Sequence, residues 1–467
     1  MSFECGIWNL LSDATRKTIR HLEKMGAGQA EGFFLASRTT ETSIRNSEIF
    51  SENAIEDVGV SFRVATSDSR VGFACTNDVN SEGAILEAGE RALAIANLSA
   101  PVLGFSLPSK RKIAEVEGLY DKAVLDVGME DSVDIARRLI QSAESVDKRV
   151  TAKGGQVVVS YLKKGVINSL GVDAETPETH VVAYLYGNGS QNDEVTPSCF
   201  EGELKRSFSL NPEKIGETMG RTIVTLFNSK QTVSFEGSVV FEPEAVSYQL
   251  CNALIGALKG ENVVAGGSAW TGKIGEMVGS GNLTVLDDAT LKGGFASRNF
   301  DDEGYPSQQT PLISKGVLKS FLHSTTTANR LKMENTGNAS RFAGGLDMAK
   351  SIVGDGYKAK PEVYPSNLVI ESGSKTKDEL IAEVDKGVLV GSMAGFVQPS
   401  SGLISTGLTR AYYVENGELK HPIKGGMLSG IAFDWFKRVE ATGNDRKQFF
   451  NSLVPSLLVK QVKIIGS

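Results

Sequence analysis

Residues 299–341 read NFDDEGYPSQQTPLISKGVLKSFLHSTTTANRLKMENTGNASR, and within them the acidic motif DDEG at residues 301–304 stands out. These residue types are typical of a β-turn, because Asp accepts local backbone hydrogen bonds and Gly adopts positive φ. The same carboxylates are also candidates for lining a cleft that binds a cation or a peptide amine. We do not expect them to form an acid and base pair, because neighbouring residues of a strand point to opposite faces.

Two further glycine motifs have the same two interpretations: TGN at residues 336–338 and GND at residues 443–445. Each fits either a tight turn or a close approach of the backbone to a bound peptide, and turn chemistry favours the turn. The candidate residues for lining a peptide cleft are therefore Asp302, Glu303, Gly304, Thr336, Gly337 and Asn338.

The composition is that of a soluble globular protein with an acidic balance. Hydrophobic residues make up 40% and charged residues 22% of the chain, and 49 basic against 56 acidic residues give a net charge of −7. Direct binding to DNA usually needs a basic face. Because no dense stripe of Lys and Arg is present, we expect no direct contact with nucleic acid.

The N-terminus and the cysteines indicate a reduced, cytoplasmic protein. The first apolar stretch is short, is interrupted by Glu4 and has no basic segment before it, so no secretory signal is predicted. No apolar run approaches the ~20 residues that a membrane-spanning helix needs. The four cysteines form no C-x-x-C pair, and they are Cys5, Cys75, Cys199 and Cys251.

Helix and strand patterns divide the 467 residues into three regions, as expected for a chain too long for one hydrophobic core. They are an N-terminal α/β module at 1–100, a central α+β module at 118–228 and a β-rich C-terminal domain at 232–467. A proline-containing linker at 99–117 separates the first two. The N-G dipeptide at 416–417 predicts a hairpin tip. The fold class predicted is α+β.

Helix signals predict three boundaries that the structure tests. One helix is expected to begin after Asn80, and a second to begin with Asp131 or Ser132 as its N-cap. A third is expected to begin near Pro243 and to end at Gly260. The buried stripe predicted for this third helix consists of Val246, Leu250, Leu254 and Leu258.

Four segments together resemble the TldD/PmbA family: DDEG, TGNASR, VENGELKHPIKG and RVEATGND. This family, also described as modulators of DNA gyrase, is built around cytoplasmic zinc-dependent peptidase subunits. The resemblance implies a two-subunit peptidase that trims unfolded or small peptides, in which zinc-bound water attacks the peptide carbonyl. It also implies a C-terminal domain of the TldD/PmbA type. Active members carry H-E-x-x-x-H on a helix upstream of DDEG.

That metal motif is missing from this chain. Counting back from GEMV at residues 275–278, which is similar to the family's G-E-x-V, the motif falls on Cys251, Asn252 and Gly256. A zinc site of this kind needs two nearby imidazoles, a third ligand and a Glu that deprotonates water. The four histidines, of which the closest two are 98 residues apart (421 − 323), are His21, His180, His323 and His421. We therefore expect no metal ligand and no catalytic residue in this chain.

Two isolated residues also have structural interpretations. His323 has no second histidine nearby, and a lone histidine is usually a structural or surface residue. Cys251 lies on the buried side of its predicted helix, where a free cysteine mostly behaves as a small apolar residue. A nucleophilic cysteine would need a histidine partner, and none is local in the sequence.

These observations predict a PmbA-like (TldE-like) subunit without a metal, which is a non-catalytic part of a zinc metallopeptidase complex that degrades or trims peptides. Zinc is expected only in a TldD-like paralogue, with which this chain forms a heterodimer or a larger complex. The peptide would add as a strand to an exposed sheet edge. Two alternatives remain open: a stand-alone homodimeric peptide-binding or scaffold protein, and a peptidase with an unrecognised active site.

Overall fold

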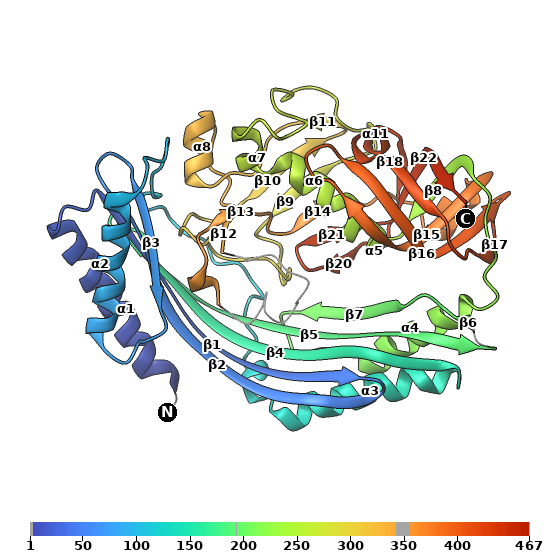
Figure 1. Ribbon diagram of the computed structural model, residues 1–467, viewed down its shortest axis with the longest axis horizontal. Coiled ribbons are helices and arrows are strands. Elements are labelled where there is room, and N and C mark those ends of the chain that lie inside the picture. Colours follow the sequence, from blue (N-terminus) through green and yellow to red (C-terminus); the bar gives the residue numbers. More distant parts are fainter. Residues whose placement is uncertain (1–2, 193, 342–354, 467) are drawn as a thin grey trace.

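The computed structural model describes residues 3–192, 194–341 and 355–466. Its N-terminal half is dominated by one large antiparallel sheet, shown as long curved arrows in Figure 1. The strand order is β3-β2-β1-β4-β5, and both β6 and β7 pair with β5. The strands are β1 (Gln29–Arg45), β2 (Glu48–Ala65), β3 (Val71–Thr76), β4 (Val150–Asn168), β5 (Asp173–Gln191), β6 (Glu194–Val195) and β7 (Cys199–Lys205).

The pairing of β1 with β4 makes a single sheet out of the first two regions of the sequence. The two strands are antiparallel and pair over fifteen residues, from Glu31 opposite Asn168 to Arg45 opposite Gly154. The segment 99–117 that connects the two regions contains no helix or strand apart from a bridge at Pro101, as the linker prediction expects.

Four helices cover one face of this sheet, and the C-terminal region covers the other (Figure 1). Strand alternation explains how both faces are apolar: Phe34 packs with the helices, whereas Phe33 and Leu35 pack against Phe300 of the C-terminal region. The helices are α1 (Phe3–Lys24), α2 (Glu82–Leu98), α3 (Met129–Val146) and α4 (Pro212–Thr225).

The helix starts agree with the sequence in α2 but not in α3. Helix α2 begins at Glu82, where the Ser81 side chain accepts a hydrogen bond from a backbone N–H, so the start predicted after Asn80 is confirmed. The N-cap predicted for α3 is wrong, because Gly128 occupies that position. Asp131 lies inside the first turn, where its carboxylate accepts the N–H of Gly128 at 2.8 Å.

The C-terminal region is β-rich, as predicted, and its larger sheet closes on itself. The strand order is β15-β8-β22-β18-β16-β17; β16 also pairs with β15, and β19 pairs with β22. This sheet consists of β8 (Phe235–Phe241), β15 (Lys386–Val397), β16 (Leu403–Glu415), β17 (Glu418–Pro422), β18 (Met427–Ile431), β19 (Val439–Thr442) and β22 (Leu457–Ile465). The β16–β17 hairpin has Asn416 and Gly417 at its tip, both with positive φ, which confirms the predicted turn.

A second C-terminal sheet has the order β11-β10-β9-β14-β21-β20 and carries the loops that face the large sheet. Its strands are β9 (Val285–Asp288), β10 (Gln309–Ser314), β11 (Val317–Leu318), β14 (Leu368–Ile370), β20 (Lys447–Phe449) and β21 (Ser452–Val454), while β12 (Ala339–Ser340) pairs with β13 (Glu362–Val363). Short helices connect the strands of the C-terminal region: α7 (Gly260–Val264), α8 (Thr325–Leu331), α10 (Lys377–Ala382), α11 (Ala432–Lys437) and η3 (Gly356–Lys358). A further short helix, η1 (Lys122–Asp126), precedes α3 in the N-terminal half. The predicted α+β class is confirmed.

The helix that was expected at Pro243 is present and runs through three segments, α5 (Pro243–Ala245), a π-helical turn η2 (Val246–Leu250) and α6 (Cys251–Leu258). Its predicted stripe is confirmed, because the four residues Val246, Leu250, Leu254 and Leu258 are at most 1% exposed. The helix ends at Leu258, two residues before the predicted Gly260, which begins α7. In the described part of the chain, no helix combines the length and the apolar character needed to cross a membrane.

Candidate functional site

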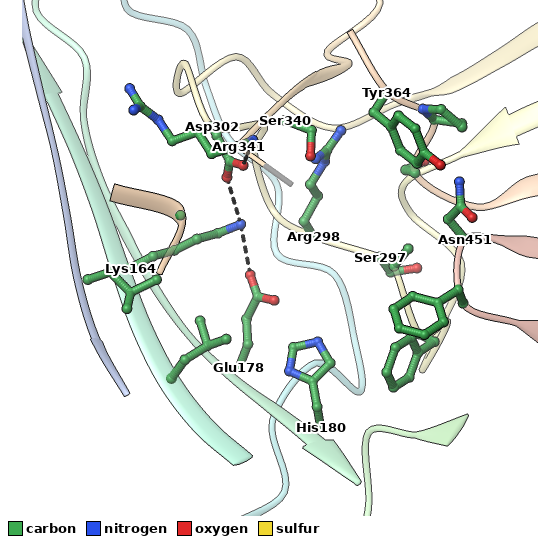
Figure 2. A pocket seen from close by; sticks show the side chains of 18 of the residues that line it. Lys164, Glu178, His180, Ser297, Arg298, Asp302, Ser340, Arg341, Tyr364 and Asn451 are labelled. Carbon is green, nitrogen blue, oxygen red and sulfur yellow. Dashed lines mark hydrogen bonds and ion pairs between the residues drawn. The ribbon is translucent and has the colours of Figure 1, made fainter. Parts of the chain in front are cut away.

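A cavity of about 190 Å³ lies between the large sheet and the loops of the C-terminal region. The sheet contributes alternate residues of β1, β4 and β5, which share one face because strand side chains alternate. Figure 2 shows these side chains on one side of the cavity and the loop residues on the other. The wall residues used below are Phe33, Leu162, Lys164, Glu178, His180, Arg206, Phe295, Arg298, Asp302, Arg341, Tyr364, Phe450 and Asn451.

One buried ion network ties the sheet to the C-terminal region beside this cavity. Glu31 on β1 lies opposite Arg63 on β2, and its carboxylate accepts bonds from Arg63 and Arg341, each at 2.7 Å. Arg63 also donates to Glu303 at 2.9 Å. All four side chains are at most 7% exposed. Removing one partner from such a network leaves a buried charge without compensation. These residues therefore hold the large sheet and the C-terminal region in fixed positions relative to each other.

A second network lies in the cavity wall. Lys164 forms ion pairs with Glu178 at 3.2 Å and with Asp302 at 3.1 Å, which Figure 2 marks with dashed lines. Arg206 pairs with Glu178 at 3.0 Å and donates to the carbonyl of Ser297 at 2.7 Å. Lys164 therefore adds a second link between the sheet and the loop that carries Asp302, beside the Arg63–Glu303 pair.

Burial and charge determine the protonation of this wall. Burial raises the pKa of Glu178, but the attraction of Lys164 and Arg206 outweighs it and brings the pKa to about 2. Burial, together with the nearby Arg206 charge, lowers the pKa of His180 well below its usual value, so this imidazole is neutral at pH 7. The pKa of Asp301, behind the wall, is raised to about 7 by burial and by repulsion from Glu303.

The DDEG motif is a turn and also reaches the cavity. The Asp301 carboxylate accepts the N–H groups of Glu303 at 3.0 Å and Tyr305 at 2.9 Å, and Gly304 has a φ of +82°. The segment is thus a turn instead of the strand that was assumed in excluding an acid and base pair. The carboxylates still diverge, because Asp302 points to Lys164 and Glu303 to Arg63.

Of the six residues predicted to line a cleft, Asp302 alone belongs to the described cavity wall. Thr336, Gly337 and Asn338 form hydrogen bonds around that wall. Gly337 accepts a bond from Arg298 through its carbonyl at 3.1 Å, and Thr336 accepts the N–H of His323 at 2.6 Å. Asn338 donates to Asp287 at 2.8 Å. The turn motifs therefore position the loop that carries Ser340 and Arg341.

His323, the lone histidine of this segment, is fully buried, and its Nδ1 lies 3.3 Å from the Thr327 hydroxyl. Burial lowers the pKa of His323 to about 4. Its place inside the wall of turns and its contact with a threonine fit the structural interpretation made from the sequence.

The expected motif position on α6 does not fit a zinc ion. The Cys251 side chain is 1% exposed, and burial raises the pKa of its thiol to about 12, so it is an apolar core residue. A Cβ on Gly256 would collide with Pro399 and lie 2.7 Å from its backbone oxygen. Asn252 is exposed and donates to the carbonyl of Tyr248 at 2.6 Å. Among the residues described, no group of three or more His, Cys, Asp and Glu is placed to hold a metal.

The sequence reasoning did not find most of the cavity wall. Lys164, Glu178 and His180 lie in strands that read as apolar runs, and their partners are distant in the chain. One signal was present: in ETHVVAYL, Glu178 and His180 lie two residues apart, on one face of a strand, directly before the apolar run that begins at Val181. Ionisable groups at such positions indicate a site or a buried ion pair.

Comparison with known proteins gives the family. Profiles of the PmbA/TldA metallopeptidase family match in three parts: domain 1 at residues 30–96, the central domain at 122–227 and the C-terminal domain at 234–466. The protein MJ0231 of Methanocaldococcus jannaschii is 29% identical over 449 residues, which cover 94% of this chain and 98% of the relative. The metalloprotease PmbA of Escherichia coli O157:H7 is 24% identical over 468 residues, covering 95% and 94%.

A solved structure agrees with these sequence matches. The crystal structure of TldE from Thermococcus kodakarensis is similar with a TM-score of 0.87 at 25% identity, covering 97% of this chain and 100% of that one. The profiles, the relatives and the shared fold together confirm the resemblance that was read from the sequence motifs. This chain belongs to the PmbA/TldD metallopeptidase family.

Proposed function

We propose that this chain is a non-catalytic, PmbA/TldE-like subunit of a zinc metallopeptidase complex that degrades or trims peptides. Its partner would be a TldD-like paralogue that carries H-E-x-x-x-H and supplies zinc-activated water. The complex would be cytoplasmic. In such a complex, this chain encloses and holds the peptide, and the paralogue breaks the peptide bond.

The observation that supports this proposal most strongly is the burial of helix α6 and the types of residue that it contains. At the positions where the count from GEMV places the ligands of active members, this chain has a buried thiol with a pKa of about 12 and a glycine packed against Pro399. Zinc is held by thiolates and imidazoles. Neither an exposed thiolate nor an imidazole is offered by Cys251 or Gly256, although the chain keeps the family's fold throughout.

Edge strands support the proposed role in holding a peptide. Strand β7 pairs only with β5, and β17 pairs only with β16, within the described residues. Each therefore leaves a row of backbone N–H and C=O groups on its outer side, where an extended peptide adds as a further strand.

Co-expression with a TldD-like paralogue tests the proposal. We expect the two chains to purify together, the zinc to track with the paralogue, and an unfolded test peptide to be cleaved by the mixture but not by this chain alone. A paralogue whose motif Glu is changed to Gln is the matched control, because it keeps the complex and removes the base. Stoichiometric zinc bound by the isolated chain, together with cleavage, would overturn the proposal.

The same experiment separates the two alternatives. A stand-alone peptide-binding or scaffold protein would form a homodimer and fail to purify with the paralogue. A peptidase with an unrecognised active site would cleave peptides alone, and its activity would survive chelators.

A further inference from the structure

Four polar side chains in the cavity wall have a buried nitrogen atom without a hydrogen-bond partner: Arg298 and Arg341 through Nε, His180 through Nδ1 and Asn451 through Nδ2. Arg298 and His180 are each 8% exposed. In Figure 2, His180 comes from β5 and Arg298 from the opposing loop, on different sides of the cavity. Buried polar groups in native proteins are nearly always paired, so unpaired ones in the residues of a cavity wall give a reason to look for a ligand there.

The charge of Arg298 is also uncompensated by an ion pair. Around it, four cations pair with four carboxylates: Arg63, Arg341, Lys164 and Arg206 with Glu31, Glu303, Glu178 and Asp302. Within the described residues, Arg298 forms no ion pair, and its recorded bond is the 3.1 Å contact from Nη2 to the carbonyl of Gly337. Arg298 is therefore the one of these five cations that has no direct ion pair in the described part of the chain.

Two further carboxylates are close enough to Arg298 for its charge to lower their pKa, but other groups occupy their oxygens. Asp287 accepts from Asn338 and from the backbone and hydroxyl of Ser366 at 2.7–2.8 Å. Asp301 accepts the backbone N–H groups of its own turn and of Ala339. Arg298 is thus available for an external acceptor.

Part of the wall is apolar and aromatic, and it includes Phe33, Phe295 and Phe450. The rings of Phe295 and Phe450 meet edge to face at 5.6 Å, and His180 lies edge-on to Phe295 at 5.1 Å. The cavity of about 190 Å³ is far larger than the roughly 10–15 Å³ that one water molecule needs. A suitable ligand therefore combines one negative charge with an apolar group.

We propose that this cavity binds the carboxy-terminal residue of a short peptide, with the α-carboxylate on Arg298 and the apolar side chain between Phe295 and Phe450. His180, being neutral, adds a hydrogen bond to the bound end. A carboxylate fits better than a phosphate, because a second negative charge would be repelled by Glu178 and Asp302 in the same wall. The choice of a peptide as ligand rests on the proposed function, and it adds to that function a selection for peptides with a free carboxy terminus.

Calorimetric titration of the isolated, unmodified chain tests this directly. The probes are N-acetyl-alanyl-phenylalanine and its carboxy-terminal amide, which differ only in the charge. We expect the acid to bind at least about tenfold more tightly than the amide, which corresponds to about 1.4 kcal/mol. Equal affinities, no binding of the acid, or displacement of the acid by an equal concentration of inorganic phosphate would overturn the proposal.

An Arg298→Gln variant locates the binding. We expect it to lose the preference for the acid, while Arg221→Gln, which removes an exposed arginine on α4, keeps that preference. Circular dichroism verifies that both variants are folded; if Arg298→Gln is not, the acid and amide comparison on the unmodified chain decides alone. Retention of the acid preference by a folded Arg298→Gln would contradict the assignment.

The outcome is separable from that of the proposed function. Binding is measured without a paralogue, so a chain that binds the acid but never forms an active complex supports the cavity and refutes the subunit role. If the complex cleaves peptides but the isolated chain shows no preference for the acid, the subunit role is supported and the carboxylate site in the cavity is refuted.

Discussion

Helix α6 and the cavity beneath the C-terminal loops are both buried, but they are built from different residue types. The helix buries a thiol, a glycine and aliphatic side chains at Cys251, Gly256 and Leu254. The cavity wall buries ionised groups such as Lys164 and Glu178. The helix segment on which the sequence places the metal motif is thus ordinary apolar core, whereas buried ionisable groups are concentrated against the large sheet.

This contrast between helix α6 and the cavity indicates which of the two regions is suited to select a ligand. An apolar core stabilises the fold without a partner, because burial alone lowers its free energy. A buried ion network gains little net stability over apolar packing and demands that every partner stay in place. Retaining such a network beside a cavity therefore indicates that the geometry of the cavity matters.

The largest effect is expected from Glu31→Gln. This change leaves Arg63 and Arg341 facing each other without their shared carboxylate, in a site that is 0% exposed at Glu31. We expect the free energy of unfolding in urea to fall by about 3–5 kcal/mol. The matched control is Glu213→Gln, which removes a surface partner of Arg138 and is expected to cost less than about 1 kcal/mol. If both variants lost the same free energy of unfolding, the buried ion pairs would contribute no more to stability than the surface pair.

The second-largest effect on stability is expected from a change in helix α6. Gly256→His restores one ligand of the metal motif, but its Cβ would lie 2.7 Å from the backbone of Pro399. Because backbone cannot move as cheaply as a side-chain end, we expect a loss of about 3 kcal/mol in unfolding free energy. Gly83→His in α2, where the one neighbour of a Cβ is the Ser81 hydroxyl at 3.9 Å, is the control. A stable Gly256→His variant would mean that the Pro399 loop yields to a ligand.

The fold could largely be predicted from the sequence, because periodicity records which face of an element is buried. The stripe of residues 243–258, the start of α2 and the Asn416-Gly417 turn are local patterns and were found. The cap of α3 was misplaced, because two polar residues competed with a glycine for the role and Asp131 caps from inside the turn.

The cavity could not be predicted in the same way, because its parts come together only through tertiary pairing. Lys164 meets Asp302 across 138 positions of sequence, and Arg341 meets Glu31 across 310. No local pattern encodes such distances. Asp302 was found because it belongs to a local cluster of carboxylates, and Arg298 was missed because a single arginine after a loop serine carries no spacing signal.

A smaller and pH-dependent effect is expected at His323. The pKa of this residue is about 4 in the folded chain against 6.5 for an ordinary histidine, so the unfolded state binds more protons between these values. Stability is therefore complete above pH 6.5 and falls as the pH decreases toward 4. Between pH 7.5 and pH 5 we expect His323 to account for a loss of about 2 kcal/mol. Urea unfolding at both pH values should show that the unfolding free energy of His323→Leu decreases less than that of the unmodified chain, by about 2 kcal/mol. An identical pH dependence in the two proteins would refute the assignment.

The smallest effect is expected one turn before Gly256, at Asn252→Glu. This residue is exposed on α6, so a glutamate there meets water and changes the free energy of unfolding by no more than about 0.5 kcal/mol. The variant restores the acidic residue of the metal motif on the one position that tolerates it. Since Cys251 and Gly256 point into packed core, we expect no zinc uptake by equilibrium dialysis and no peptide cleavage. Zinc binding by Asn252→Glu alone would show that ligands from elsewhere in the chain reach this face, and the contrast between the sealed helix and the polar cavity would then fail.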